Sequence, residues 1–279
     1  MTSPDPDDPI TIRRPQSPAE YRSLQDVQRA AWGIDDDSYI VPVATLIGAD
    51  KHGGLVLGAF RGDATPVGFS FAFLAKIHGR LGLYSQLTGI LPGYQNRGLG
   101  TKLKLAQRDF ALSQGIDLIA WAFDPLQAGN AHFNIARLGA SCTHYYPDFY
   151  GPRLDSLNRG TPTDRLLAQW EVSCPPRPPI DPATLASIPR ALSLQTSSLP
   201  IPEPAPHTPP ADAPALAIEI PASITPLRQS QPQSALRWTL AVRHAFLSLF
   251  DRGYSATHFF VQHSPLPERG IYLLLRSPG

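Results

Sequence analysis

A proline-rich stretch from Cys174 to Pro214 most limits how this chain of 279 residues can fold. The stretch holds 13 of the 31 prolines, mixed with Ser, Thr and Ala. Because proline donates no backbone hydrogen bond and these residues can bury little surface, we expect residues 175–214 to form a linker or surface arm. The arm separates residues 10–174 from a small αβ unit, residues 215–279, which we expect to dock on the larger part. Residues 1–9 are expected to be a disordered N-terminus.

Strand and helix signals alternate in residues 10–174, which predicts an α/β domain. Apolar runs and period-two alternation favour strands, and apolar residues three or four apart favour helices. We expect strands at 10–14, 54–60, 66–74, 81–90, 116–123, 141–146 and 166–172, and helices at 18–32, 42–49, 99–114 and 127–138. In the C-terminal unit we expect strands at 215–220, 257–262 and 270–275, and a helix at 234–250.

Charge and composition argue against several partners. The formal net charge is +1, so no chain-wide field favours nucleic acid or an anionic membrane. Cys142 and Cys174 are too few for a disulfide framework, and no metal-ligand spacing surrounds either. The N-terminus lacks the pattern of a signal peptide, and no run approaches the roughly 18–20 apolar residues of a membrane helix. We therefore expect a soluble, cytoplasmic protein without a metal.

The junction between the strand at 81–90 and the following helix carries the clearest chemical signal. A Pro92-Gly93 turn leads into the run Gln95-Asn96-Arg97-Gly98-Leu99-Gly100-Thr101. Glycine lets a ligand approach the backbone, and the first helical turn leaves amides unpaired, so an anion such as a pyrophosphate fits there. Side chains of Arg97, Thr101 and Lys102 can add contacts. The simpler alternative is a tight turn that happens to need two glycines.

Two other phosphate-binding motifs can be compared with this run. A P-loop needs lysine where Leu99 stands, so that interpretation fails. A dinucleotide fingerprint needs a third glycine at the position of Leu103, although Asp124 could serve as its acidic residue. The glycine pattern therefore fits neither motif.

The motif Gln95-x-x-Gly98-x-Gly100 resembles the acyl-CoA-binding motif of the GNAT superfamily of N-acyltransferases. A closer resemblance, to a branch of predicted GNAT acetyltransferases with a C-terminal extension, covers nearly the whole chain outside residues 1–9 and the arm. It is carried by Leu103-Lys104-x-x-Gln107-Arg108, Trp121-x-Phe123-Asp124-Pro125-Leu126, Asn130-Ala131-x-Phe133-Asn134-Ile135, Tyr150-Gly151 and Arg237-Trp238. The resemblance implies an α/β (α+β) fold with a mixed, mostly antiparallel sheet flanked by helices.

The resemblance also implies a cosubstrate, acetyl-CoA or another acyl-CoA, and direct attack of an amine on its thioester in a ternary complex. Branch members are associated with N-acylation of amino acids, including succinyl transfer, so the donor stays open between acetyl and succinyl. The acceptor is expected to be the amine of a small molecule. The expected acyl-CoA contacts are Thr88, Ile90, Gln95, Asn96, Arg97, Gly98, Leu99, Gly100, Thr101, Lys102, Asn130 and Phe133.

Catalytic groups are harder to assign. Many superfamily members place a tyrosine where this chain has Ile135, so Tyr146 is our first candidate for the general acid. Asp124 follows an apolar strand and is the candidate to bind or deprotonate the amine, although a helix cap suits it equally well. Arg165, Asn134 and Tyr150 are candidate substrate-binding residues. A buried ion pair of Arg165 with Asp164 or Asp155 is the alternative for that arginine.

Two further functions stay open at this point. The missing tyrosine would also suit a catalytically inactive module that binds acyl-CoA for regulation. A protein lysine acyltransferase, with the C-terminal unit as a docking module, is the third interpretation. Three roles stay open for the C-terminal unit: it could complete the substrate cavity, form a homodimer contact, or cap the first domain.

Overall fold

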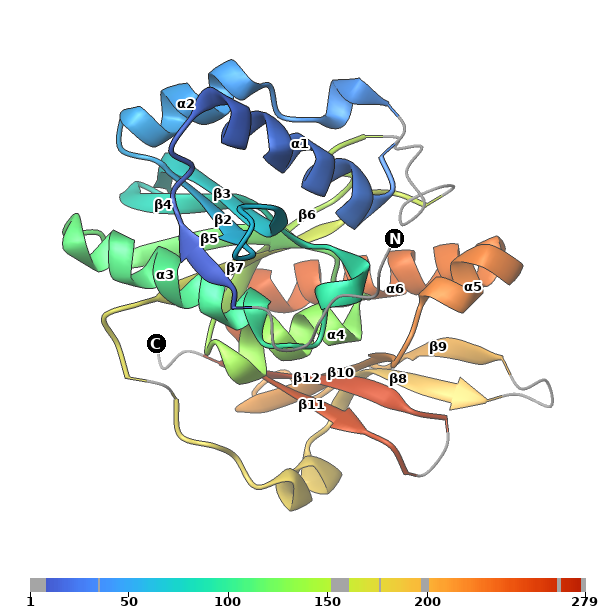
Figure 1. Cartoon of the computed structure of the whole chain (residues 1–279). Coiled ribbons are helices and arrows are strands. Elements are labelled where there is room, and N and C mark those ends of the chain that lie inside the picture. The colour runs from blue at the N-terminus through green and yellow to red at the C-terminus, as the bar shows by residue number, and fades with distance from the viewer. Residues whose placement is uncertain are drawn as a thin grey trace. The chain divides into compact units, whose positions relative to one another are not determined.

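The computed structural model describes residues 9–34, 36–151, 161–175, 177–196, 201–264 and 267–276. The chain divides into two compact units, which Figure 1 traces in colour along the chain. Unit 1 comprises Met1–Trp121 with Glu171–Ser173, and unit 2 comprises Ala122–Trp170 with Cys174–Gly279. Strands β5 and β7 each cross a boundary between the units.

Unit 1 is a sheet with helices on both faces. Its strands lie in the order β1 (Thr11–Arg13), β2 (Leu55–Phe60), β3 (Pro66–Ile77), β4 (Arg80–Ile90) and β5 (Leu118–Phe123). The pairs from β1 to β4 are antiparallel, and β4 runs parallel to β5. The helices are α1 (Pro18–Trp32), α2 (Val43–Lys51) and α3 (Leu99–Ser113), with the 3-10 turns η1 (Asp37–Tyr39) and η2 (Pro92–Tyr94).

The side chains of β2, which point alternately to the two faces of the sheet, show which helices cover which face. Val56 and Phe60 pack with Leu24 of α1 and Leu46 of α2, whereas Leu55 and Leu57 pack with Leu103 of α3. Successive side chains of a strand point to opposite faces, so α1 and α2 cover one face and α3 covers the other (Figure 1). This arrangement places the start of α3 at the end of β4.

Unit 2 contains the remaining strands. Its strand order is β7 (Arg165–Glu171), β6 (Ser141–Tyr146), β11 (Tyr254–Gln262), β12 (Arg269–Arg276), β10 (Ala215–Pro221), β8 (Arg190–Thr196) and β9 (Pro202–Pro206). The remaining elements are α4 (Ala128–Ala131), the π-helix η3 (His132–Arg137), the 3-10 helix η4 (Pro182–Ser187), α5 (Thr225–Ser230) and α6 (Pro232–Asp251). Phe246 of α6 packs on Tyr145 and Tyr272, which anchors α6 to the sheet.

Most strand pairs are antiparallel, and helices flank the strands of each unit. Among the described residues, β4 with β5 in unit 1 and β8 with β10 in unit 2 run parallel. The fold expected from the sequence, a mixed and mostly antiparallel sheet flanked by helices, is confirmed.

The proline-rich stretch does not remain a linker or arm along its length. It contributes η4, β8 and β9, and β9 is an edge strand. Every second residue of β9 from Pro202 to Pro206 is a proline. The residues between them face β8, and His207, the next in that series, donates its amide to the carbonyl of Ala191 in β8. The three proline nitrogens therefore face the outer edge, where no ladder hydrogen bond is required. The domain limits expected from composition, 10–174 and 215–279, stay a prediction.

Candidate functional site

The loop between β4 and α3 is exposed and holds two left-handed residues. Asn96 has φ 60° and Gly98 has φ 76°, and Gln95 donates its side-chain amide to the carbonyl of Ile90 at 3.1 Å. The Arg97 guanidinium lies over the ring of Tyr94, 5.3 Å from its centre. The loop therefore has a defined conformation in which the backbone, rather than bulky side chains, lines the approach to the helix.

The N-terminus of α3 offers unpaired amide donors. Its first internal hydrogen bond joins the amide of Lys102 to the carbonyl of Gly98 at 3.0 Å, and no side chain caps the helix. The amides of Leu99, Gly100 and Thr101 consequently have no acceptor in the part of the chain that the structure describes. A Cβ added to Gly98 would meet no atom within 4 Å. Open space, free amides and the positive end of the helix dipole together suit an anion.

Strand β4 loses a partner halfway along its length. It pairs with β5 only at Leu83 and Tyr84, so the ladder to β5 ends before Ser85. On its other edge β4 stays paired with β3, but Phe71 faces Leu87 and Ala72 faces Ser85, which leaves Gln86 as a bulge. Bulges bend a strand and often end its pairing. The edge of β4 from Ser85 to Ile90 is thus open to an added chain, and it leads to the loop at α3.

A buried polar cluster lies under this part of β4. It consists of Ser70 from β3, Ser85 from β4, and Lys104 and Gln107 from α3. The ammonium of Lys104 donates to Oγ of Ser85 at 2.9 Å, and Gln107 donates to the same oxygen at 3.0 Å. Oε1 of Gln107 has no partner among the described residues. The cluster is therefore not fully satisfied by the protein itself.

Lys104 is unusual because it is a buried cation. Only 4% of the residue is exposed, and its ammonium lies 3.8 Å from the ring centre of Trp121. Burial lowers the pKa of Lys104 to about 7. In the sequence, Lys104 stands out only as part of a motif, because a lysine in an amphipathic helix is ordinarily expected on the exposed face. Its spacing from Leu103 and Gln107 on α3 was the available signal.

Three predicted residues of unit 2 lie together. Tyr146 of β6 pairs with Arg165 of β7, and its ring stacks on Phe149 with centres 5.0 Å apart. Phe149 contacts Tyr150 edge to face, and the Arg165 guanidinium lies 5.2 Å from the centre of the Tyr150 ring. Burial raises the pKa of Tyr146. Phe149 and Tyr150 are exposed, whereas Arg165 is buried beneath them. Exposed aromatic rings with a guanidinium behind them suit an organic substrate that carries a carboxylate.

Asp124 occupies both of its carboxylate oxygens. Oδ1 accepts the amide of Leu126 at 2.9 Å, as in an Asx turn, and Oδ2 accepts Nη1 of Arg228 at 2.7 Å. Both side chains of this ion pair are largely buried. The contact with Leu126 precedes α4, whose N-cap is Gln127 without a side-chain cap, so Asp124 does not cap that helix. The role of Asp124 as a base stays a prediction.

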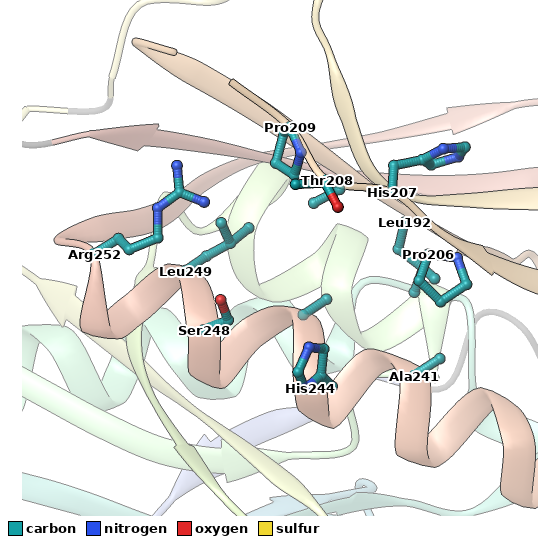
Figure 2. Close-up of a pocket in the computed structure, with 12 residues that line it drawn as sticks. Leu192, Pro206, His207, Thr208, Pro209, Ala241, His244, Ser248, Leu249 and Arg252 are labelled. Atoms are coloured by element: carbon teal, nitrogen blue, oxygen red, sulfur yellow. The ribbon is translucent and has the colours of Figure 1, made fainter. Parts of the chain in front are cut away.

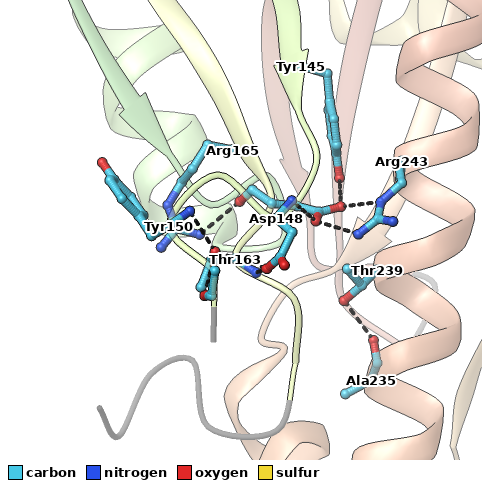
Figure 3. Close-up of polar contacts among 10 residues, drawn as sticks. Tyr145, Asp148, Tyr150, Thr163, Arg165, Ala235, Thr239 and Arg243 are labelled. Carbon is cyan, nitrogen blue, oxygen red and sulfur yellow. Dashed lines mark hydrogen bonds and ion pairs between the residues drawn. The ribbon is translucent and has the colours of Figure 1, made fainter. Parts of the chain in front are cut away.

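Asp164 joins Tyr145 and Arg243 in a polar network. Figure 3 labels these two partners. The buried carboxylate of Asp164 accepts the hydroxyl of Tyr145 at 2.6 Å and two nitrogens of Arg243 at 2.7 and 2.9 Å. Burial and Asp164 raise the pKa of Tyr145 far above its usual value. Arg165 donates to the backbone carbonyl of Asp164 at 2.8 Å. The carboxylate expected to pair with Arg165 therefore pairs with Arg243, and Asp155 lies outside the described residues.

The segment expected as one helix over 127–138 forms α4 and then the π-helix η3. The amide of Leu138 donates to the carbonyl of Phe133, five residues earlier, at 3.0 Å. Asn130 is exposed, Phe133 is half-buried, and Asn134 and Ile135 are buried. Ile135 thus fills the core at the position where the resemblance led us to look for a tyrosine.

A cavity of about 210 Å³ lies elsewhere in unit 2, as Figure 2 shows. Its polar lining includes His207, His244, Ser248 and Arg252. Arg252 donates to the backbone carbonyls of Pro210 and Ala211. None of the predicted site residues lines this cavity, so it is separate from the chemistry indicated by the sequence.

The residues that the structure describes contain no group of three or more His, Cys, Asp or Glu side chains arranged to hold a metal ion. Within the same residues, no helix combines the length and the apolar character needed to cross a membrane.

No family model matches the chain, and no curated protein is significantly similar to it. Among solved structures, it is similar to a putative acetyltransferase of the GNAT family from Desulfovibrio desulfuricans, with 17% identity, a TM-score of 0.45, and coverage of 59% of this chain and 99% of that one. The ribosomal-protein-S18-alanine N-acetyltransferase from Escherichia coli shares 12% identity over 62% of this chain and 100% of its own, with a TM-score of 0.46.

A third structure, PaiA N-acetyltransferase from Thermoplasma acidophilum in complex with coenzyme A, shares 18% identity over 58% of this chain and 99% of its own, with a TM-score of 0.43. All three are described as acetyltransferases. Identities and TM-scores this low assign neither an activity nor a substrate to the chain, so its function must be argued from its own residues.

Proposed function

We propose that this protein is an acyl-CoA-dependent N-acyltransferase that moves an acetyl or succinyl group to the amine of a small molecule, such as an amino acid. One observation carries the proposal: the open edge of β4 leads directly to the unpaired amides at the start of α3. The unpaired amides of α3 suit a pyrophosphate. The open edge of β4 suits a pantetheine arm, whose two amide groups can bind there as an added strand would.

The lengths of strand and ligand agree. Ser85 to Ile90 spans roughly 17 Å at about 3.4 Å per residue. The pantetheine arm has about twelve bonds between its phosphate and its sulfur, as many as roughly four residues of backbone, and extends about 14 Å. An arm that begins beside Ile90 would carry its thioester to the region of the Gln86 bulge. Thr88 and the loop from Gln95 to Lys102 are the proposed contacts along this path.

Transfer then requires an amine to attack the thioester carbonyl and the thiolate to leave. The nitrogen forms a bond to the carbonyl carbon, the carbon–sulfur bond breaks, and the thiolate takes up a proton. We propose Tyr146 as the donor of that proton, and Arg165 and Tyr150 as contacts of an acceptor carboxylate. Asn130, Phe133 and Asn134 remain proposed ligand contacts. Asp124, tied to Arg228, is the weakest of the proposed catalytic residues.

Calorimetric binding of coenzyme A tests the site. In Gly98→Asp a carboxylate enters the proposed anion site, and we expect affinity for coenzyme A to fall at least about 100-fold. Gly79→Asp is the matched control: Gly79 also has a positive φ, 88°, and also has no atom within 4 Å of an added Cβ, but it lies in the β3–β4 turn. Unchanged affinity in Gly98→Asp, or no binding by the wild type, would refute the proposal.

A thiol-release assay separates the activities. Acetyl- and succinyl-CoA are each mixed with D- and L-amino acids, and free coenzyme A is measured. Release that depends on the amino acid supports the proposed enzyme. Binding of acyl-CoA without release for any amine indicates the inactive module, and acylation of lysines in added protein substrates indicates the lysine acyltransferase.

A further inference from the structure

Lys104 is a buried lysine without an anionic partner among the described residues. Its contacts within the described residues are the hydroxyl of Ser85 and the face of Trp121, and no carboxylate forms an ion pair with it. Lysines are rarely buried unless they are paired, because removal of an ammonium from water is costly. A buried ammonium with spare hydrogen-bond donors is therefore an incomplete site that an anionic ligand group would complete.

The position of Lys104 indicates which part of a ligand would reach it. Its ammonium touches Ser85, the first residue of β4 beyond the ladder with β5. Ser85 thus marks the closed end of the open strand edge, and the start of α3 marks the other end. On the lengths given above, the sulfur of a bound pantetheine would stop about 3 Å short of Ser85. The acyl group, and not the pantetheine, would meet Lys104.

We propose that Lys104, with Ser85 and Gln107 beside it, binds a carboxylate at the far end of the acyl group. This inference rests on the proposed function. The donor is then the coenzyme A thioester of a short dicarboxylic acid, with succinyl as its simplest test case, and not acetyl. A succinyl carboxylate lies roughly 5 Å beyond the sulfur when extended, which matches the remaining distance plus one hydrogen bond. An acetyl group ends in a methyl that offers the ammonium nothing to bind.

A transient anion is the competing explanation. Lys104 could instead stabilise the thiolate or oxyanion that forms during transfer, and it would then act on every donor equally. The two explanations differ in one measurable quantity, the preference between a charged and an uncharged acyl chain of similar length.

Calorimetry with succinyl-CoA, butyryl-CoA and free coenzyme A measures that preference without knowledge of the acceptor. We expect the wild type to bind succinyl-CoA about 30-fold or more tightly than butyryl-CoA, as a charged hydrogen bond in a closed site allows. In Lys104→Met the preference should disappear or reverse, while the affinity for free coenzyme A stays within about twofold. Lys76→Met, which removes an exposed lysine from β3, should leave all three affinities unchanged.

Ser85→Ala is the second variant, in case Lys104→Met does not fold. It removes the hydroxyl that orients the ammonium, and we expect it to reduce the succinyl preference severalfold. Equal affinity of the wild type for succinyl- and butyryl-CoA would overturn the inference while leaving the proposed function standing, and so would a preference unaffected by Lys104→Met. Failure of free coenzyme A to bind would instead remove the proposed function itself.

Discussion

Burial of Lys104 predicts that this lysine weakens the empty protein, and that replacing it with methionine stabilises the fold. Methionine has nearly the same length, is apolar, and can fill the same space against Trp121. Burial lowers the lysine pKa from its ordinary value of 10.5 to about 7. At about 1.4 kcal/mol for each factor of ten, the difference corresponds to about 5 kcal/mol. That figure is the upper bound for the gain in Lys104→Met at low pH.

The pH dependence follows from which state holds the proton. Between pH 7 and 10.5 an unfolded chain keeps a proton on this lysine that the folded chain has released. The stability of the wild type therefore rises with pH across this window, and Lys104→Met lacks that increase. We expect the advantage of the variant to be largest at pH 6, at most about 5 kcal/mol, and to fall to at most about 2 kcal/mol at pH 9.

Urea denaturation of the wild type, Lys104→Met and the control Lys76→Met at pH 6, 7.5 and 9 measures this difference. Hydrogen exchange of peptides from α3 and β4 reports the same effect locally, which matters because the chain has two compact units. An advantage of the variant that is equal at pH 6 and pH 9 would refute the argument, because it would mean that Lys104 carries the same charge in the folded and unfolded chain. Destabilisation at every pH would refute it as well.

Three more predictions concern other residues. Arg243→Ala leaves the carboxylate of Asp164 buried, so unfolding free energy should fall by about 3 kcal/mol in denaturation experiments. In Tyr146→Phe, turnover should fall about 100-fold while calorimetry finds coenzyme A affinity unchanged, because only proton transfer is lost. In Gly89→Ala, the new Cβ would lie 2.7 Å from a tryptophan ring of α1 and should cost about 1–3 kcal/mol, whereas Gly129→Ala in α4 meets no atom within 4 Å and should gain about 0.5 kcal/mol in thermal melts.

Local signals predicted much of the fold. The Ser17 cap and following proline indicated a helix over 18–32, and the structure has α1 at Pro18–Trp32 with Ser17 accepting from Glu20. The strand expected at 81–90 is β4 at Arg80–Ile90, and the helix expected after the glycine loop is α3. These elements depend on residues close together in the chain, so their patterns are readable from the sequence.

We missed strands β8 and β9 because we considered how many prolines the stretch contains and not that those of β9 occupy alternate positions. Alternate prolines remove donors from one edge of a strand only, and the other edge can still pair. In β9 the paired edge uses the residues between the prolines, and the structure places that edge on β8. Composition alone predicts a linker here, whereas the spacing of the prolines is compatible with an edge strand.

The bulge at Gln86 and the burial of Lys104 could not be predicted for a different reason. A bulge depends on the register between two strands. Nothing in the sequence of β4 itself indicates that Gln86 would have no partner on β3. Lys104 is buried because α3 lies under that part of the sheet, which is a tertiary relation. Helical spacing alone assigns a lysine to the exposed face, since exposure is the ordinary outcome.

The same physical cause connects the stability and the specificity proposed for Lys104. An ammonium held among Ser85, Gln107 and Trp121 costs the empty protein free energy because no anion compensates it. A ligand that supplies a carboxylate recovers part of that cost, and an uncharged ligand of the same size does not. The discrimination between acyl groups therefore comes from an unfavourable feature of the free protein, so a substitution that removes the specificity should also make the empty chain more stable.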